Sequence, residues 1–387
     1  MYWPLQENII SDFEKKKLVQ FIFKTKRFTQ FKEVKKFENN YSKWQGCKYS
    51  VFVNSGSSAN LLIIQAAKEL YRWSNNDEVI VPAVTWPTTI TPVIQSNLKP
   101  VFVDCNLVDF SFDYEDLKKK ITNKTRAIFV AHIIGFPANI NKIKEIIKNR
   151  NIKLLEDTCE SQGATIGKKK AGNFGLASSF SFYWGHHLTT IEGGMICTNN
   201  EEFYNTCLLK RSHGLARELP KKLHSKIKRK YSSINFKFLF LNDGFNLRNT
   251  EINAHLGIFQ LPSINKWILQ RNNNYDFFYK ICSRYKKHLI TTKVKGMSSF
   301  VFPFLFREKI KKLQFEKVLK KYKIESRPFI AGNLLKQPFL KNYRYNNLKN
   351  ANFLHENAIY IGNNQFVNID RIRKLEKILK FFFNEKA

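Results

Sequence analysis

The chain has 387 residues, which excludes a peptide, a small disulfide-stapled domain or a single zinc module and allows one large or two medium domains. Hydrophobic residues make up 43% and charged residues 25%, as in folded proteins, and no apolar run approaches the roughly 20 residues of a membrane span. The formal net charge of +34 makes a polyanion the first class of partner to consider.

The positive charge is spread along the chain and recurs in Lys15–Lys17, Lys118–Lys120, Lys168–Lys170 and Lys309–Lys312. A nucleic-acid face would instead concentrate charge on one element with interleaved aromatic residues. The chain is also rich in Phe, Asn, Ile and Tyr, which share AT-rich codons with Lys. We therefore expect no nucleic-acid partner, although the charge would attract a small anionic substrate. The densest run, Lys221–Lys230, is interpreted as a solvated loop and not as a docking patch.

The six cysteines include no CxxC pair and no Cys/His spacing of the zinc-site kind. Neither a disulfide framework nor a metal site is therefore expected. The first residues lack a positively charged start followed by an apolar run, so no secretory signal is visible and the expected location is the cytoplasm.

Short apolar, β-branched runs alternate with amphipathic stretches from about residue 45 to 200. Strands are predicted at residues 49–53, 78–82, 99–104, 127–133, 152–157, 179–183 and 194–198. Helices are predicted between several of them, at residues 59–70, 114–121 and 143–149. This alternation predicts an α/β layered domain with a largely parallel sheet.

A smaller α+β unit is predicted at the C-terminus. Its elements are helices at 275–285, 315–322 and 369–383 and a strand at 300–306. We place the boundary near Leu261–Trp267, so that a large domain with an N-terminal helical segment spans residues 1–262 and a small domain spans residues 263–387.

The segment 54–60, NSGSSAN, leaves the strand predicted at 49–53 and opens an apolar helix. Main-chain N–H groups at a helix N-terminus, with a glycine that permits close approach and serine hydroxyls as further donors, can bind a phosphate. An ordinary helix cap is the alternative for such a turn.

Two carboxylates, Glu156 and Asp157, end the strand predicted at 152–157. The carboxyl ends of strands form the ligand crevice of open α/β sheets, so an acid there could hold a protonated ring nitrogen or, less readily, a metal. A helix-capping aspartate remains the alternative.

The adjacent His186 and His187 follow the strand predicted at 179–183. Successive side chains of an extended segment point to opposite sides, so we expect one of the two to be structural. A loop histidine with a pKa near neutrality is a candidate general base, and simple packing is the alternative.

Together these segments resemble the DegT/DnrJ/EryC/StrS family of fold-type-I pyridoxal-phosphate (PLP) enzymes, sugar aminotransferases that act on nucleotide-linked sugars. The resemblance is colinear over nearly the whole chain. Its motifs are NSGSSAN (54–60), PAVTWPTT (82–89), LLEDTCESQGA (154–164), FSFYWGHHLTTIEGG (180–194), RSHG (211–214), GFNLRN (244–249) and ESRPFIAGN (325–333). It implies an aspartate-aminotransferase-like large domain with a mixed, mostly parallel sheet, a smaller C-terminal α+β domain, and a homodimer with shared active sites.

One departure carries most of the functional information. The family has a lysine that binds the cofactor covalently where this sequence has His186, and an imidazole cannot form that bond. The paired histidines and the EDTCES and RPFIAGN segments resemble the branch that removes the carbon-3 hydroxyl of GDP-4-keto-6-deoxymannose in dideoxysugar synthesis. A related dehydratase branch also has this histidine but needs an iron–sulfur cluster, for which clustered cysteines are absent here.

The resemblance implies roles for the residues that match the family's motifs. Gly56, Ser57 and Ser181 would contact the cofactor phosphate, and Asn246 would reach it from the neighbouring subunit. Trp86 would stack on the pyridine ring; without the resemblance, a buried core tryptophan is an equal alternative.

The remaining matches concern the ring and the substrate. Asp157 would pair with the pyridinium nitrogen, and Glu160 stands near the ring hydroxyl where aminotransferases usually have glutamine. Arg217 and Arg327 are candidates for the diphosphate of the sugar nucleotide, although exposed loop arginines are common. His213 fits packing as well as catalysis.

The resemblance implies that noncovalently held PLP takes the amino group of L-glutamate, becomes pyridoxamine phosphate and condenses with the 4-keto group of the sugar. His186 would then remove a proton from the cofactor methylene, and the hydroxyl at carbon 3 would leave. Two alternatives stay open: a sugar aminotransferase that uses another lysine, and a noncatalytic polyanion-binding protein supported by charge alone.

Overall fold

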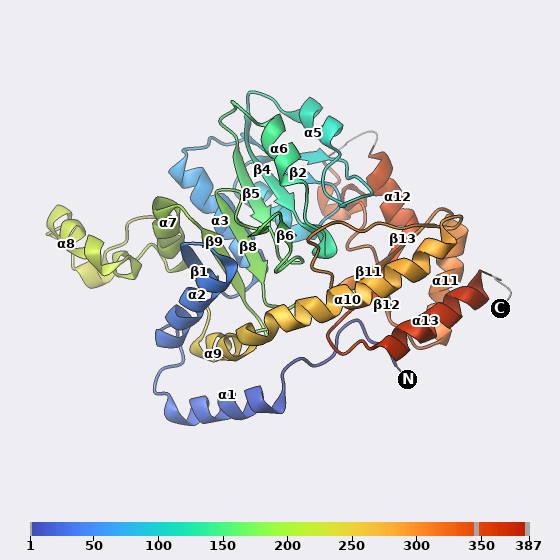
Figure 1. The fold of residues 1–387 in the computed structure, drawn as a ribbon. Coiled ribbons are helices and arrows are strands. Elements are labelled where there is room, and N and C mark those ends of the chain that lie inside the picture. The colour runs from blue at the N-terminus through green and yellow to red at the C-terminus, as the bar shows by residue number, and fades with distance from the viewer. Residues whose placement is uncertain (1, 344–347, 384–387) are drawn as a thin grey trace.

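A computed structural model describes residues 2–343 and 348–383. Its centre is a seven-stranded sheet in the order β1-β9-β8-β5-β4-β2-β3 (Figure 1). The strands are β1 (Tyr49–Val53), β2 (Glu78–Pro82), β3 (Lys99–Val103), β4 (Thr125–Ala131), β5 (Lys153–Asp157), β8 (Ala177–Ser181) and β9 (Gly194–Thr198). All neighbours are parallel except β9, which is antiparallel to β1 and β8. The predicted α/β fold with a mixed, mostly parallel sheet is confirmed.

Helices cover both faces of this sheet because its strands alternate apolar side chains between them. In β2, Val79 and Val81 join the core under α3, whereas Ile80 joins the core on the opposite face. The first face is covered by α3 (Gly56–Leu70), α4 (Thr91–Gln95) and α7 (Glu201–Arg211), and the second by α5 (Tyr114–Lys120) and α6 (Ile140–Ile146). A third core joins β1, β8 and β9 to α2 (Lys32–Gln45) and α9 (Glu251–Gln260).

The C-terminal unit is built on a four-stranded antiparallel sheet in the order β10-β11-β13-β12. Its strands are β10 (Leu289–Ile290), β11 (Val301–Phe306), β12 (Ser326–Pro328) and β13 (Ala358–Gly362). Its helices are α10 (Ile264–Cys282), α11 (Lys309–Lys321), α12 (Lys349–Asn357) and α13 (Ile369–Phe382). The helix predicted at 275–285 overlaps the second half of α10, which begins much earlier.

The start of the chain packs against this C-terminal unit (Figure 1). Trp3 is 2% exposed, its backbone pairs with Ile324, and its Nε1 donates a hydrogen bond to the carbonyl of Gly362. The chain then passes through α1 (Asp12–Lys24), which contacts α9. The domain boundary at residues 262 and 263 stays a prediction.

The basic segment is helix α8 (Lys221–Lys230), so the predicted loop is wrong. Lys, Arg and Leu are good helix formers, which explains a helix despite the like charges. The helix projects from the body beyond α7, and none of its residues is buried (Figure 1).

The short strands β6 (Thr165–Ile166) and β7 (Lys169–Lys170) form a separate hairpin. None of the helices in the described ranges is long and apolar enough to cross a membrane.

Candidate active site

Four segments meet where the parallel strands end: the N-terminus of α3, the turn after β2, the loop after β5 and the loop after β8. This edge is the usual ligand crevice of an open α/β sheet. The structure therefore brings the first three sequence motifs to one place.

The turn into α3 lies directly against the end of β8. A Cβ placed on Gly56 would lie 2.6 Å from Cβ and 3.0 Å from Oγ of Ser181, so a side chain at position 56 would collide there. Ser55 caps the helix with its hydroxyl, and Ser57 Oγ donates to Thr88 Oγ1 at 3.1 Å. The turn is thus both a helix cap and a cradle of small residues with hydroxyls on each side, a suitable site for a phosphate.

Asp157 is buried and its carboxylate is held from two other segments. Oδ2 accepts hydrogen bonds from Asn60 Nδ2 and Thr89 Oγ1, both at 2.8 Å, and Oδ1 accepts one from the main-chain N–H of Cys159 at 3.1 Å. No helix follows β5 directly, so the capping alternative is wrong. The network fixes the direction of the carboxylate relative to α3.

Trp86 precedes the short 3-10 helix Pro87–Thr89, whose last residue holds Asp157. Its side chain is 57% exposed, which excludes the buried core tryptophan considered from the sequence. An exposed aromatic ring beside a phosphate cradle and a carboxylate is available for stacking on a flat ligand.

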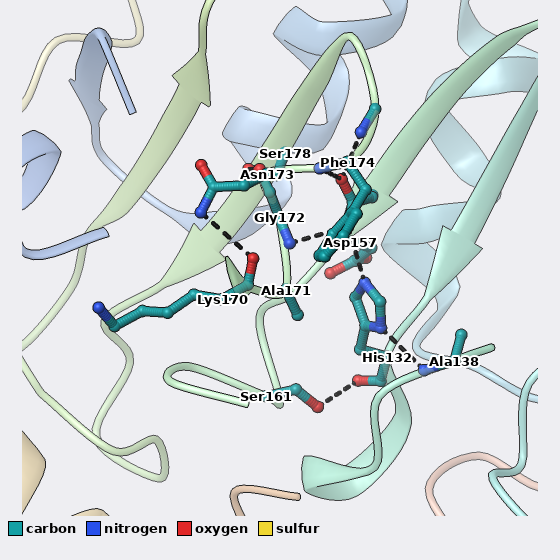
Figure 2. Close-up of polar contacts among 12 residues, drawn as sticks. His132, Ala138, Asp157, Ser161, Lys170, Ala171, Gly172, Asn173, Phe174 and Ser178 are labelled. Carbon is teal, nitrogen blue, oxygen red and sulfur yellow. Dashed lines mark hydrogen bonds and ion pairs between the residues drawn. The ribbon is translucent and has the colours of Figure 1, made fainter. Parts of the chain in front are cut away.

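Glu156 faces away from Asp157, because successive side chains of a strand alternate. Its Oε2 lies 3.1 Å from His132 Nε2 and accepts from the N–H of Gly172 at 2.8 Å, and Figure 2 labels both of these partners. Oε1 accepts from the N–H groups of Phe174 and Gly175 at 2.8 and 2.7 Å. Glu156 therefore ties the 172–175 loop to the end of β4 and is unavailable to a ligand.

The ring of His132 both accepts and donates a hydrogen bond in this network. Its Nδ1 accepts a hydrogen bond from the N–H of Ala138, so the proton resides on Nε2, which donates to Glu156 (Figure 2). Burial alone would raise the pKa of Glu156, but the hydrogen bonds from His132 and the loop N–H groups hold it below its ordinary value.

Glu160 is half-buried and accepts a hydrogen bond at 2.8 Å from the N–H of Ile134, a residue with a left-handed backbone (φ 43°). Burial raises the pKa of Glu160 to about 7; the hydrogen bond from Ile134 opposes the shift and the charge of Asp157 adds to it. Burial and the charge of Glu160 also raise the pKa of Tyr360 to about 12. Tyr360 pairs in register with Arg327, an exposed residue of β12, so these side chains belong to one neighbourhood.

The two histidines differ in their surroundings. His187 is completely buried, with Nε2 2.9 Å from the carbonyl oxygen and 3.0 Å from Oγ of Ser298. Ser298 Oγ donates to the carbonyl of Gln162, whose Nε2 donates to the carbonyl of Ser181. His187 is therefore a structural link between the small domain and the end of β8.

His186 is half-buried, and its ring lies against Phe300 and Tyr183, with centroids 6.0 and 6.2 Å away. Burial, and then the charge of Arg271, lowers the pKa of His186 to about 4. The imidazole is thus neutral at physiological pH. Its Nδ1 is buried without a hydrogen-bond partner in the described part of the chain.

Asn246 and His213 meet at Arg248, whose backbone pairs with Val53 just before the turn into α3, and Arg217 lies outside this group. Arg248 bridges Asn246 and His213, with Nε 3.1 Å from Asn246 Oδ1 and Nη2 3.4 Å from His213 Nε2. Arg217 donates to the carbonyl of Lys237. His213 is exposed, which excludes packing as its role. Among the described residues, none of the three predicted side chains hydrogen-bonds to the network of Asp157 and Ser181.

The model of the DegT/DnrJ/EryC1/StrS aminotransferase family matches residues 10–379. The chain belongs to this family. Its sequence is 39% identical to the GDP-4-keto-6-deoxy-D-mannose 3-dehydratase of Escherichia coli O55:H7, across 98% of this chain and 99% of that protein. The resemblance inferred from the sequence motifs is confirmed.

Two solved structures show the same fold over the same length. GDP-4-keto-6-deoxymannose-3-dehydratase with a trapped PLP-glutamate geminal diamine is 38% identical, with a TM-score of 0.91 over 98% of this chain and 100% of that chain. A mutant of the same enzyme with bound GDP-perosamine is 37% identical, with a TM-score of 0.90 and the same coverage. The fold predicted for this family member is therefore confirmed.

Several residues of the site were not found from the sequence. Asn60 stands one helical turn after Gly56, so the NSGSSAN motif already placed both on one face of α3. Thr89 lies in the family's PAVTWPTT segment. For Tyr360 and Arg271 no local pattern points to the site, because both reach it through the packing of the small domain.

Proposed function

We propose that this member of the DegT/DnrJ/EryC1/StrS family is a PLP-dependent 3-dehydratase of a nucleotide-linked 4-keto-6-deoxy sugar, GDP-4-keto-6-deoxymannose, with L-glutamate as the amino donor. The observation that carries the proposal is His186 at the position of the family's covalent lysine. The 39% identity to a named 3-dehydratase over nearly the full length of both chains supports the same activity.

The residues at the strand ends fit PLP. Gly56, Ser57 and Ser181 form a cradle of the right chemistry for its phosphate, and Asp157 is a fixed, buried acceptor for a protonated ring nitrogen. Trp86 offers an exposed aromatic face. When bound, the cofactor supplies an electron-accepting ring that stabilises the negative charge left by proton removal.

His186 is proposed as the base. Because its pKa is held at about 4, the imidazole is unprotonated at neutral pH and can accept a proton. It has no primary amine, so it cannot bind the cofactor covalently or release an amino product by exchange with an amine of its own, which favours elimination over amination. His187, fixed by Ser298, holds the turn that carries His186.

Glu160 stands where aminotransferases usually have glutamine, and it can still donate a hydrogen bond to the ring oxygen of the cofactor when its carboxyl is protonated. With a pKa of about 7, its carboxyl is protonated in about half of the molecules at neutral pH. A protonated carboxyl can donate a hydrogen bond to the ring oxygen, as a glutamine amide can.

Asn246, His213 and Arg217 are proposed to act in the neighbouring subunit of a homodimer. In the described part of one protomer none of the three hydrogen-bonds to the Asp157 network, which supports this arrangement. Arg327 is proposed to bind the diphosphate in its own protomer. It pairs with Tyr360 of β13, and the charge of Glu160 contributes to the raised pKa of Tyr360, so Arg327 lies on the side of the small domain that faces Glu160. The cytoplasmic location stays a prediction.

A product mass spectrum tests the proposal. Purified protein is incubated with PLP, L-glutamate and GDP-4-keto-6-deoxymannose. We expect a sugar nucleotide that has lost one oxygen, with release of ammonia and 2-oxoglutarate. Replacement of the keto oxygen by an amine would instead establish an aminotransferase, and salt-sensitive polyanion binding without PLP uptake would overturn both enzymatic assignments.

A further inference from the structure

Cys47 and Cys197 are far apart in the sequence, and the fold brings their sulfur atoms to one hydroxyl group. Cys47 lies in the short connection between α2 and β1, whereas Cys197 lies in β9. Ser50 of β1 is paired with Cys197 across the antiparallel ladder. The Oγ atom of Ser50 lies 3.4 Å from Cys197 Sγ and 3.7 Å from Cys47 Sγ. The pairing of β1 with β9 therefore creates a thiol pair that no CxxC spacing reveals.

The two thiols differ in their access to solvent. Both are free cysteines, and both belong to the core that joins β1, β8 and β9 to α2 and α9. Cys197 and Ser50 are buried, whereas Cys47 is half-buried and packs against the edge of this core. Because Cys47 lies outside both α2 and β1, its side chain can turn toward Cys197 without breaking the ladder. A small oxidant from solvent would therefore meet Cys47 first.

Hydrogen bonding prepares Cys47 to react. Ser42 Oγ donates to Ser50 Oγ at 2.7 Å, so the single hydroxyl proton of Ser50 is left for one of the two sulfurs. Hydrogen bonding with Cys197 lowers the pKa of Cys47 to about 7; burial opposes this shift, and Ser50 adds to it. Burial, and then the interaction with Cys47, raises the pKa of Cys197. Since the thiolate is the nucleophile, Cys47 is the reactive member and Cys197 the protonated one.

We propose that Cys47 and Cys197 form a redox-sensitive pair that closes to an intramolecular disulfide on reaction with a peroxide. The Cys47 thiolate attacks one oxygen of hydrogen peroxide, the O–O bond breaks, and Cys47 becomes a sulfenic acid as hydroxide leaves. The sulfur of Cys197 then attacks the Cys47 sulfur, and the thiol proton leaves with the hydroxyl group as water. In total the two thiols lose two electrons and two protons, and the peroxide is reduced to two molecules of water.

This disulfide would enclose the part of the chain that carries the strand-end site. Gly56, Asp157 and His186 all lie between the two cysteines in the sequence. A cross-link that closes such a long loop restricts the unfolded chain and thereby favours the folded one. Cytosolic disulfides are usually transient and often sense oxidants, which is the behaviour expected of a pair that is reduced at rest. The inference does not depend on which reaction the site performs.

Peptide mapping of the full-length, PLP-loaded protein tests the pair. Reduced protein is separated from dithiothreitol, treated with hydrogen peroxide, alkylated with N-ethylmaleimide in urea and digested without reduction. We expect the peptides of Cys47 and Cys197 to be joined, with a loss of two hydrogen atoms, and the remaining cysteines to be alkylated. Dithiothreitol added after the peroxide should restore alkylation of both residues.

Three variants assign the roles within the pair. Cys197→Ser should abolish the link and leave a sulfenic acid at Cys47 that dimedone traps. Cys47→Ser should abolish the link and leave Cys197 unoxidised. Cys282→Ser, at another buried thiol in α10 of the C-terminal unit, is the matched control and should form the link as wild type does.

The wild-type map decides the inference even where a variant fails to fold. Sulfinic acid at Cys47 together with an alkylatable Cys197 would overturn it, because the second sulfur would then not reach the first. A disulfide between two chains, seen as a doubled mass on a non-reducing gel, would also overturn it. So would a map in which both cysteines stay alkylatable after peroxide treatment.

Discussion

Asn60 and Asp157 stand 97 residues apart in the chain and are joined by a 2.8 Å hydrogen bond between Nδ2 and Oδ2. The bond connects the first turns of α3, which carry the phosphate cradle, to the end of β5, which carries the proposed partner of the ring nitrogen. The two ends of one cofactor would thus be bound by groups with a fixed separation, a form of preorganisation.

Replacing Asn60 by alanine removes one of the two side-chain donors to Asp157 Oδ2. A hydrogen bond to a charged group contributes about 1.5 kcal/mol, so we expect the Kd for PLP to rise about tenfold. Titration of PLP binding by absorbance measures the change. Gln65→Ala, on the same helix but bonded to Ser96, is the matched control, and an equal loss in both variants would contradict the role of Asn60.

Gly56→Ala should place a methyl group 2.6 Å from Cβ of Ser181. We expect a loss of about 1–3 kcal/mol in the free energy of unfolding and weaker PLP binding, because the cradle is filled. The double variant Gly56→Ala with Ser181→Gly removes the nearest colliding atom and should recover part of the stability. No recovery in chemical denaturation would show that the collision is not with Ser181.

His186→Asn should reduce dehydration about 10²–10⁴-fold, the usual contribution of a general base, while leaving PLP binding nearly unchanged. In the wild type, the pKa of about 4 means that His186 loses its ability to accept a proton only as the pH falls toward 4. The kcat/KM profile should therefore show no acidic limb from His186 between pH 6 and 8. A limb that disappears in His186→Asn would contradict this expectation.

Glu156→Gln should lower the free energy of unfolding by about 3 kcal/mol, because an amide cannot accept all the hydrogen bonds that the buried carboxylate accepts. The folded-state pKa of Glu156 lies below the ordinary value of 4.5. Its contribution is therefore fully present above pH 4.5 and is lost as the pH falls through the folded-state value. Denaturation curves at several pH values, with the exposed Glu192→Gln as control, measure the difference.

Mixing two inactive variants tests the shared site of the proposed homodimer. Asn246→Ala damages a site through the partner subunit, whereas His186→Asn damages the site of its own subunit. Random reassociation of equal amounts should restore about one quarter of wild-type activity, since half of the dimers would contain one intact site. Activity that stays at the level of the separate variants would place Asn246 in its own protomer's site.

The sequence patterns predicted the central sheet well because each strand is a short, largely buried run, and β1, β2, β3, β4 and β9 also carry β-branched residues. They also located the glycine turn, Asp157 and His186, since these positions lie within contiguous motifs. The distinction between Glu156 and Asp157 could not be predicted, because it depends on which face of β5 meets His132. The burial of Arg271 was equally invisible, since a polar run such as QRNNN does not indicate that α10 packs against a loop of the small domain.

The helix of residues 221–230 shows a different limit of sequence interpretation. Its charge density suggested a loop, although the individual helix propensities of its residues favour a helix. Leu223 and Ile227, one turn apart, were the pattern that could have indicated it.

The buried Trp3 also constrains how this protein is made. Its Nε1 bonds to Gly362, 359 residues later, and its backbone pairs with Ile324. On the ribosome, Trp3 emerges long before Ile324 and Gly362 are synthesised. Its side chain therefore cannot be buried in its native position until translation is nearly complete. A message that stops before β13 would release a chain whose Trp3 has no place to pack and stays exposed to aggregation.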